Sequence, residues 1–467
     1  DVVLDESSLR VFRCQSQNHF MARSLIIPIL QRLEDPGPLN PDTRKPEEAA
    51  KFARYYVEGL HGGHGDAVDQ LALEIEVSSG GRNAYLFSGT IGSGKSTELM
   101  RMAQDLRERG HFAAVVNARE YLNPQMEISI SELLLAMALA VWELTATAQG
   151  KNPTDGQRWQ WWKSLFASGV ELKEIEIPTD LGKAKLALVS NPTVRERIRQ
   201  FHEQSLDRLV AEVHAFFEEC AETLRGLLDP VAKCVLVLDS LEHFGGAAIP
   251  GEPDAVFNSL QRMFNVHARH LQLPGWSVVY SVPPLLGKLS PGIASAWGMS
   301  RTYALTSAHV FQDRSHDLDT TTVDKKLLPL LQKRLGEPWE LLLSEDQLRL
   351  LVEKTGGDLR DLLRCTRAAL LKGLSKKIFP VSPDLLEEAF SDMRRPYLPL
   401  SQASRARLSI VARSFEVDDL LKDDSHWPVI MADLAQKRIL MYLNGQEWYG
   451  VHPLLRDVLK PDTAVGE

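Results

Sequence analysis

Cysteine is scarce in this sequence, with four residues among 467 and no CxxC pair. Cys14, Cys220, Cys234 and Cys365 lie far apart, so neither a zinc site nor a disulfide framework is indicated. No apolar run approaches the roughly 18 residues needed to cross a bilayer, and the N-terminus lacks the basic-then-apolar pattern of an export signal. We therefore expect a soluble, reduced, cytoplasmic protein with no membrane partner.

An excess of basic residues is also missing. The formal net charge is −9, from 53 Lys and Arg against 62 Asp and Glu. This balance argues against a protein that coats nucleic acid through bulk electrostatics, although a local basic face is still compatible with it. The hydrophobic fraction of 44% and the charged fraction of 25% are those of an ordinary globular protein with a real core.

The order of patterns along the chain predicts an α/β fold. Short apolar stretches at 84–87, 112–117, 234–238, 276–282 and 302–305 alternate with helical segments, which implies a parallel sheet covered on both faces. A helical insertion over about 146–230 separates the second and third stretches. Its apolar stripe from Ile198 to Leu224 predicts one helix of about 30 residues.

We expect four parts: an N-terminal helical segment (1–78), the α/β core (79–312), a helical lid (313–395) and a winged-helix domain (396–467). The winged helix is suggested by helices followed by a hairpin, in which Asn444-Gly445 predicts a type I′ turn. Two features stay open. The cluster Trp159, Trp161 and Trp162 fits a packed corner of the insertion or a partner-binding surface. His61 and His64, set among glycines, fit a mobile loop better than a metal site.

The segment 89–96 carries the clearest chemical signal. It reads Gly-Thr-Ile-Gly-Ser-Gly-Lys-Ser and satisfies GxxxxGK[ST] between a predicted strand and a predicted helix. Glycines let backbone N–H groups curl around phosphates, and the helix N-terminus adds its positive dipole end. We expect Lys95 to reach the β- and γ-phosphates of ATP and the Ser96 hydroxyl to ligate Mg²⁺. The nucleotide-binding residues are predicted to be Gly89, Thr90, Gly92, Ser93, Gly94, Lys95, Ser96 and Thr97.

A metal site of this kind needs a carboxylate at the end of an adjacent buried strand. Asp239 ends the apolar run that begins at Val235 and is the predicted Mg²⁺ partner. An aspartate at the end of an apolar run also fits a turn cap, which is the alternative.

Around these motifs the chain resembles two groups of regulatory ATPases. AAA+ proteins usually place a Glu directly after the aspartate of this strand, whereas this chain has Ser240 there and its nearest acid is Glu242. The string Asp-Ser-Leu-Glu at 239–242 resembles the Asp-Gly-x-Asp arrangement of the STAND class, which includes NACHT proteins. The resemblance implies Glu242 as the group that activates water, with slow hydrolysis.

The same resemblance assigns five further residues. Ser281, at a strand end, is similar to a sensor that faces the γ-phosphate. Arg301 stands where AAA+ proteins carry an arginine finger, and a solvated arginine is the alternative. The segment 355–360 resembles the sensor 2 region of origin-recognition AAA+ proteins, where Asp358 would cap a helix and Arg360 would contact the γ-phosphate or simply be exposed. His452, in a His-Pro-Leu element, resembles a STAND latch on the β-phosphate of ADP, or is a packed core histidine.

These features predict an ATPase whose ATP or ADP state switches homo-oligomerisation or the activity of an effector protein, with ATP closing the lid and winged helix onto the core. Such proteins in bacteria often act in antiviral defence or in mobile-element systems. The alternative is a DNA-binding AAA+ initiator or loader that uses the winged helix. Lys and Arg do not outnumber Asp and Glu between Ser401 and Lys460, so charge disfavours strong duplex binding. A third hypothesis, a metabolic kinase, is disfavoured because the sequence contains no phosphoacceptor pocket motif.

Overall fold

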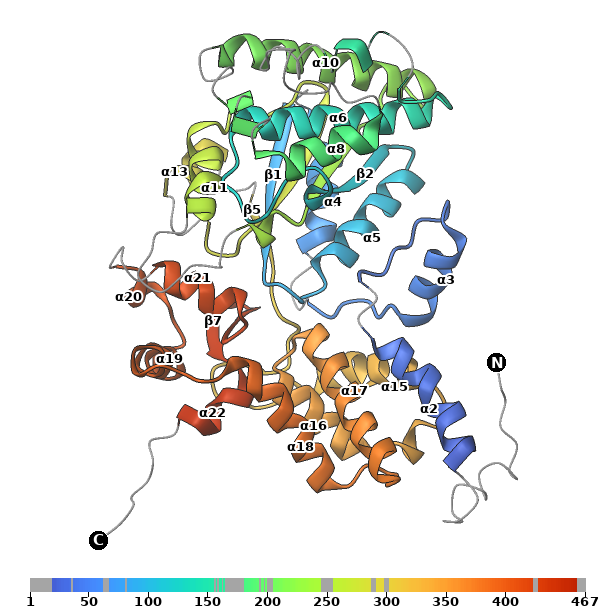
Figure 1. The fold of residues 1–467 in the computed structure, drawn as a ribbon, viewed down its shortest axis with the longest axis vertical. Helices are drawn as coiled ribbons and strands as arrows, with labels where there is room; N and C mark the ends of the chain where they lie inside the picture. The colour runs from blue at the N-terminus through green and yellow to red at the C-terminus, as the bar shows by residue number, and fades with distance from the viewer. Residues whose placement is uncertain are drawn as a thin grey trace.

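The computed structural model describes residues 19–34, 37–61, 67–79, 82–154, 157, 159–161, 163, 180–192, 195–196, 198–199, 205–244, 255–286, 291–297, 302–422 and 427–459. An α/β body occupies one half of the molecule, and a helical lid and a C-terminal helix-and-hairpin region occupy the other (Figure 1). The chain passes between the halves through the P-loop side of the sheet.

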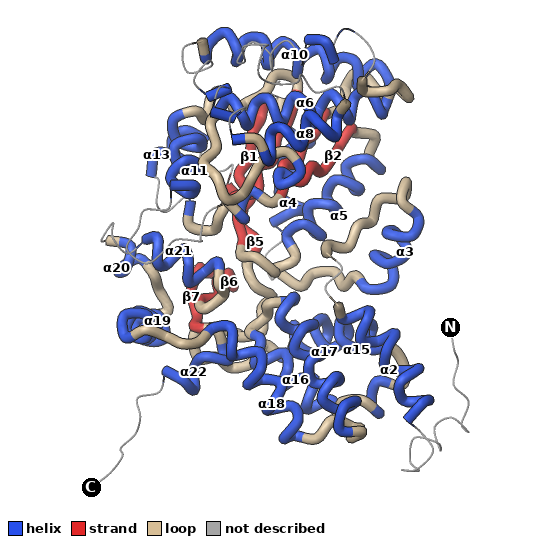
Figure 2. Tube along the Cα trace, viewed as in Figure 1, coloured by secondary structure: helices blue, strands red, loops and turns tan. Residues whose placement is uncertain are grey.

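One five-stranded sheet forms the centre of the α/β body (Figure 2). All its pairings are parallel and the order is β2-β3-β4-β1-β5, so the prediction of a parallel sheet is confirmed. The strands are β1 (Arg82–Gly89), β2 (Phe112–Asn117), β3 (Cys234–Asp239), β4 (Trp276–Val282) and β5 (Thr302–Leu305).

Helices cover both faces of this sheet because alternate strand residues point to opposite sides. In β3, Val235 and Val237 pack with α4 (Ala67–Val77) and α5 (Lys95–Glu108). Leu236 and Leu238 face the other core, which contains α6 (Ile130–Ala148), α10 (Leu206–Leu227) and α11 (Ala255–Val266). Two shorter helices, α8 (Leu181–Ser190) and α13 (Pro291–Trp297), lie beside them.

Helix α6 is long and apolar enough, by length and composition, to cross a membrane. The prediction that no apolar run approaches this length was therefore wrong. Within the protein 83% of its apolar window is buried, because α10 packs along it and the sheet lies beneath it. Its apolar character has a structural explanation as a helix buried on several sides.

The helical insertion differs from its predicted form. A single helix of about 30 residues was expected, but α10 begins at Leu206, after Ser205 with the non-helical angles φ −140° and ψ 31°. The apolar stripe from Leu209 to Leu224 is buried as predicted. Trp159 is also buried, and Trp161 stacks on Phe216 with ring centroids 4.4 Å apart. These contacts describe a packed corner, while Trp162 lies outside the described residues.

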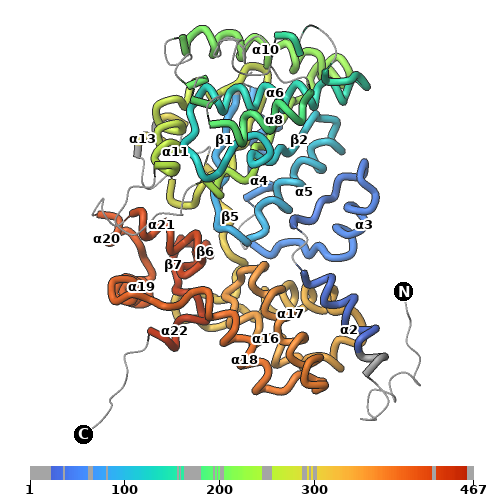
Figure 3. The backbone as a smooth tube through the Cα atoms, viewed as in Figure 1, coloured from blue at the N-terminus to red at the C-terminus, as the bar shows by residue number. Residues whose placement is uncertain are grey.

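The N-terminal helices are shared between the two halves of the molecule (Figure 3). Helix α2 (His19–Leu33) packs against the lid helices α15 (Leu328–Leu335) and α17 (Leu359–Lys376). Helix α4 instead packs on the sheet, and it was not predicted from the sequence. Helix α3 (Pro46–Tyr55) lies between these two helices in the chain.

Helices form the lid, as its prediction as a helical region implies. The stretch 320–335 is continuous but includes a π-helical part, Val323–Leu327, between α14 (Thr320–Thr322) and α15. Ser344 begins α16 (Glu345–Thr355) with a capping box, and Asp358 caps α17 through the N–H of Asp361, as predicted. Helix α18 (Pro383–Arg394) follows.

The C-terminal region is like a winged helix. It comprises α19 (Gln402–Ser414), α20 (Asp418–Leu421), α21 (Trp427–Ala435), the antiparallel strands β6 (Ile439–Asn444) and β7 (Gln446–Val451), and α22 (Pro453–Leu459). The predicted type I′ turn was wrong. Asn444 pairs with Gln446, and only Gly445 has a positive φ. The Asn444 amide donates to the carbonyls of Phe311 and Gln312, which holds Asn444 in the strand.

Candidate nucleotide-binding site

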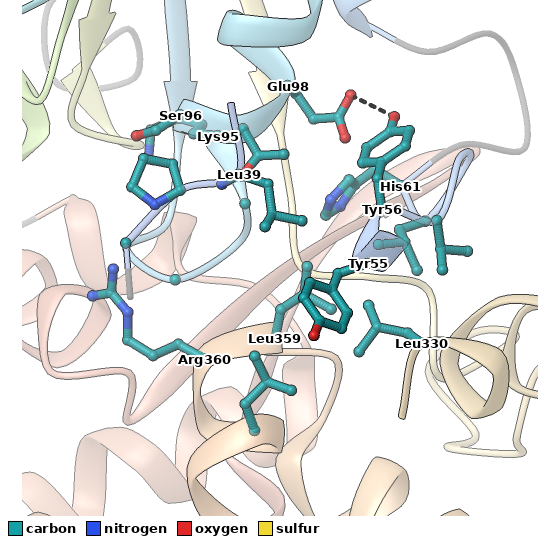
Figure 4. A pocket seen from close by; sticks show the side chains of 18 of the residues that line it. Leu39, Tyr55, Tyr56, His61, Lys95, Ser96, Glu98, Leu330, Leu359 and Arg360 are labelled. Carbon is teal, nitrogen blue, oxygen red and sulfur yellow. Dashed lines mark hydrogen bonds between the residues drawn. The ribbon is translucent and has the colours of Figure 1, made fainter. Parts of the chain in front are cut away.

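A cavity of about 150 Å³ lies where β1 passes through the P-loop into α5 (Figure 4). Four parts of the chain line it: the N-terminal segment 37–61, the P-loop with the first turn of α5, Glu242 and His243 after β3, and lid residues of α15 and α17. The β1 strand ends at Gly89 and α5 begins at Lys95, so the connection is the strand-loop-helix that phosphate binding requires.

The loop takes its shape from glycines with positive φ. Gly92 has φ 93° and Gly94 has φ 97°, a region that side-chain-bearing residues rarely adopt. The Ser93 hydroxyl donates to the Thr90 carbonyl at 2.9 Å and tightens the same turn. The hydroxyl oxygen of Thr90 is buried without a hydrogen-bond partner.

Lys95 is held by three protein oxygens. Its ammonium donates to the carbonyls of Gly89 at 3.0 Å and Thr90 at 3.2 Å, and lies 2.9 Å from Oε1 of Glu242. An ammonium has three N–H donors, so these contacts use all of them. Both side chains of the Lys95–Glu242 pair are only 4% exposed, so loss of either partner without a replacement leaves an uncompensated buried charge.

Glu242 reaches Lys95 because of a turn at Ser240. Ser240 has φ 74°, an uncommon value for a residue with a side chain, and starts the one-turn helix Leu241–His243. Oε2 of Glu242 accepts from the Ser281 hydroxyl at 2.6 Å. Burial alone would raise the pKa of Glu242, but Lys95, His243 and the Ser281 bond together lower it. Glu242 is therefore an ionised carboxylate beside the P-loop.

Asp239 and Ser96 meet at the end of β3. The Ser96 hydroxyl bonds to the Asp239 carboxylate, whose Oδ1 is buried without a partner. Burial and the nearby Glu242 raise the pKa of Asp239, although Ser96 and Lys95 oppose the shift. A hydroxyl beside a partly unsatisfied buried carboxylate fits the oxygen ligands that Mg²⁺ takes. These two residues would hold the ion, which would neutralise charge on the phosphates when bound.

The protein combines a parallel sheet, a P-loop after β1 and a carboxylate at the end of β3. This is a P-loop nucleotide-binding fold.

Comparison with known proteins supplies similar structures but no family. No family model matches the chain, and no curated protein matches it. Among solved structures, Cdc6p from Pyrobaculum aerophilum is 13% identical with a TM-score of 0.35, over 87% of this chain and 96% of its own. A Walker-type ATPase of Pyrococcus abyssi is 14% identical with a TM-score of 0.39, over 85% and 95%.

The ORC2 protein of Aeropyrum pernix, solved in ADPNP and ADP complexes, is 12% identical with a TM-score of 0.39, over 92% and 95%. At these identities and TM-scores, the likenesses carry no conclusion about the activity, substrate or partner of this chain.

Arg360 adds positive charge at the P-loop end of the cavity, and His243 adds an imidazole beside it. Both residues line the cavity, and Figure 4 shows Arg360 rising from the start of α17 toward the P-loop. Burial, with the charges of Lys95, Arg119 and Arg360, lowers the pKa of His243 despite the nearby Glu242. The predicted contact of Arg360 with the γ-phosphate is compatible with this place and stays a prediction. His243 was not singled out from the sequence, since no motif marks it.

The other predicted residues lie elsewhere. Ser281 is fully buried, and its hydroxyl bonds to Glu242 rather than lining the cavity. His452 is fully buried between the lid and the winged helix, with Nε2 3.7 Å from Asp361 and its ring 5.0 Å from that of Tyr397. It does not line the cavity, so the packed-histidine alternative describes its position. Arg301 lies outside the described residues, as does His64.

The winged helix touches the P-loop through Lys437. The Lys437 ammonium lies 2.8 Å from Asp358 and 3.0 Å from Asp361, and all three side chains are at most 9% exposed. A Cβ built at Gly92 would lie 2.8 Å from Lys437 Nζ and 2.8 Å from Asp358 Oδ2. The lid and the winged helix therefore meet directly on a P-loop glycine.

Helix α21 extends this contact along the core. Its residues Met431 and Leu434 line a small hollow together with Thr90 and Ile91 of the P-loop. Trp427, at the start of the helix, packs against Phe257 with ring centroids 4.9 Å apart. Sequence reasoning missed these contacts because they join segments at least 170 residues apart.

The N-terminal segment was also missed as part of the site. The Leu39 N–H donates to the Thr97 hydroxyl at 3.0 Å, and Tyr56 donates to Glu98 at 3.2 Å. Tyr55 and His61 line the same side of the cavity (Figure 4). An alternation of aromatic and apolar residues before the P-loop was the one available signal, and it also fits an ordinary helix end.

Proposed function

We propose that this chain is a nucleotide-gated regulatory ATPase in which ATP entry shifts the lid and winged helix away from the P-loop. The observation that carries the proposal is that the Lys437 and Asp358 side chains pack closely against Gly92. Any movement of the loop around a phosphate must move this buried ion pair, and with it the winged helix. A two-state contact of this kind is what nucleotide switches use.

The partners of Lys95 support the same mechanism. Its donors are all used by Gly89, Thr90 and Glu242, so a phosphate oxygen must replace one of them. Glu242 is the exchangeable partner, because the two carbonyls belong to the loop itself. Once released, its ionised carboxylate stays tethered by Ser281 and is available to accept a proton from an attacking water. Asp239 and Ser96 hold the site for Mg²⁺.

The size of the cavity also supports gating. Its volume of about 150 Å³ is below the roughly 300–1,000 Å³ of pockets that take small-molecule ligands. Segment 37–61, α15 and α17 enclose it, so a complete nucleotide requires these walls to separate. The sequence-based expectation was that ATP closes the lid and winged helix onto the core. The contacts described above favour the opposite direction.

The nature of the partner is the open part of the proposal. The helix before the hairpin, α21, packs its side chains on the ATPase core and contains no Lys or Arg. A protein partner or a second copy, bound after release of α21, suits such an apolar helix better than a DNA groove. The DNA-loading alternative is tested in parallel. A role in defence stays a prediction from the sequence.

The test compares wild type, Lys95→Ala and Glu242→Gln, each with ATP, ADP or no nucleotide. Light scattering after size exclusion reports assembly, and pulldown reports protein partners. The proposal expects ATP-dependent assembly or capture in wild type, its loss in Lys95→Ala and its persistence in Glu242→Gln. Salt-resistant duplex binding that depends on ATP would favour the loader instead. Identical behaviour in every nucleotide state would overturn the switch.

A further inference from the structure

His243 follows Glu242 in the one-turn helix after β3, and both residues line the cavity beside the P-loop. Nε2 of His243 lies 4.0 Å from Oε1 of Glu242, the same oxygen that contacts the Lys95 ammonium at 2.9 Å. The His243 side chain is 27% exposed, whereas those of Lys95 and Glu242 are each 4% exposed. One buried carboxylate oxygen therefore has a lysine as its present partner and a solvent-accessible imidazole close by.

Phosphate binding changes what Oε1 of Glu242 contacts. In the proposed function Lys95 exchanges Glu242 for a phosphate oxygen, while the Ser281 hydroxyl keeps its 2.6 Å bond to Oε2. Burial would raise the pKa of Glu242, and Lys95 is the main group that lowers it. A buried charge that loses its partner without a replacement is strongly destabilising. Departure of Lys95 therefore requires either a new cation at Oε1 or a proton on Glu242 itself.

Before nucleotide enters, the surroundings of His243 keep its ring neutral. Burial lowers the pKa of His243 and Glu242 raises it, and the net shift is below the ordinary value of 6.5. Three cations contribute to the decrease: Lys95 of α5, Arg119 after β2 and Arg360 of α17. Bound phosphates would neutralise these positive charges, and removal of Lys95 would leave Oε1 of Glu242 open to the imidazole. Both changes favour the protonated ring.

We propose that His243 replaces Lys95 as the cationic partner of Glu242 when nucleotide binds, by taking up one proton from solvent so that Nε2–H bonds to Oε1. The step forms one N–H bond and releases no group, and the buffer supplies the proton. His243 is thus a positioning residue, which holds the carboxylate of Glu242 through Oε1 as Ser281 holds it through Oε2. This inference deepens the proposed function, because it rests on the displacement of Lys95 by a phosphate.

The experiment measures proton uptake when the non-hydrolysable analogue ADPNP binds with Mg²⁺. Titration calorimetry at about pH 7, in buffers of different ionisation enthalpy, gives the number of protons taken up per nucleotide. Protons exchanged by the nucleotide itself cancel in the difference between wild type and His243→Gln. We expect wild type to take up about 0.5–1 proton more than His243→Gln. His111→Gln is the matched control and should equal wild type, because His111 lies 3.5 Å from Glu76 and does not line the cavity.

The pH dependence of affinity supplies a second readout. Between about pH 8 and pH 6, the affinity of wild type for ADPNP should rise relative to that of His243→Gln by up to about tenfold per pH unit, since binding takes up at most one proton at this residue. His243→Lys carries a fixed charge, so it should restore the affinity lost in His243→Gln at about pH 8 without extra proton uptake. An affinity ratio of wild type to His243→Gln that does not change with pH would overturn the proposal.

The remaining outcomes separate the two levels of inference. Wild type that fails to bind ADPNP would defeat the proposed function itself. Binding with equal proton uptake in wild type and His243→Gln would overturn the role of His243 alone. If Glu242→Gln loses the uptake while His243→Gln keeps it, Glu242 itself takes the proton and the assignment to His243 is wrong. Should His243→Gln fail to fold, the difference in proton uptake between wild type and His243→Lys decides the question in the same way.

Discussion

Lys437 of the winged-helix region and Asp358 of the lid form a buried ion pair of 2.8 Å directly over Gly92 of the P-loop. Asp361 completes the cluster at 3.0 Å from Lys437 and also accepts from Tyr397 at 2.8 Å. Burial would raise the pKa of Asp361, but His452 and Lys437 lower it, so it is ionised beside the lysine. Three parts of the chain that are distant in sequence are thus joined by charge at the phosphate-binding loop.

Lys437→Met should weaken the attachment of the winged helix. It leaves two buried carboxylates without their cation, a change that typically costs about 3–5 kcal/mol of unfolding free energy. Chemical denaturation measures this loss, and limited proteolysis reports exposure of the winged helix. Lys422→Met is the control, because Lys422 forms only an exposed pair with Asp419. Equal unfolding free energies of the two variants would show that the Lys437 cluster does not stabilise the attachment of the winged helix.

Gly92→Ala should disturb the P-loop beyond the effect of backbone strain. Gly110 has a similar φ of 88° with nothing within 4 Å of its Cβ position, so Gly110→Ala carries the strain alone, of about 1–3 kcal/mol. Gly92→Ala adds contacts of 2.8 Å to Lys437 and Asp358. Denaturation should show a larger cost for Gly92→Ala, and calorimetry should show at least about tenfold weaker ATP binding. Equal losses of unfolding free energy in Gly92→Ala and Gly110→Ala would mean that Lys437 and Asp358 do not pack closely on the P-loop.

Glu242→Gln should retain ATP binding and lose hydrolysis by about 10²–10⁴-fold, because the amide cannot accept the proton of water. Ser281→Ala should reduce turnover less, since Ser281 only positions Glu242 through a 2.6 Å bond. Ser281→Thr keeps the hydroxyl and should restore most of the rate. Phosphate release under single-turnover conditions separates chemistry from binding. Full activity in Glu242→Gln would exclude Glu242 as the base.

His61 should contribute to acid sensitivity of the fold. Its pKa in the folded protein is about 4, against an ordinary value near 6.5, so the unfolded chain binds more protons between these values. Its stabilising effect is complete above pH 6.5 and is lost as the pH falls toward 4. Between these limits, the unfolding free energy of wild type should fall by up to about 1.4 kcal/mol per pH unit more than that of His61→Leu. Parallel pH profiles would show that His61 is not buried as a neutral ring.

Much of the core was predictable because its signals are local. The GxxxxGK[ST] loop, the apolar run ending at Asp239 and the strands at 112–117, 276–282 and 302–305 depend on neighbouring residues alone. The capping of α17 by Asp358 is of the same kind. Such patterns predict the sheet, the phosphate loop and the metal carboxylate without any tertiary information.

The remaining features depend on contacts between distant segments. Nothing near Lys437 in sequence indicates that it faces Asp358, and nothing near His61 indicates that it lines the cavity with α17. The turn at 444–446 was wrong for a similar reason, because the Asn444 amide is bound to residues 311–312 of the interdomain connection. Tertiary hydrogen bonds overrode a local turn preference there.

The most direct test of the gating claim is hydrogen–deuterium exchange in α21 (Trp427–Ala435), with and without the non-hydrolysable analogue ADPNP. We expect nucleotide to increase exchange in α21 in wild type, because phosphate binding displaces Lys437 and Asp358 from Gly92. Lys95→Ala should show no change. Unchanged or stronger protection of α21 in wild type, under conditions where calorimetry shows ADPNP bound, would contradict the claim that nucleotide releases the winged helix.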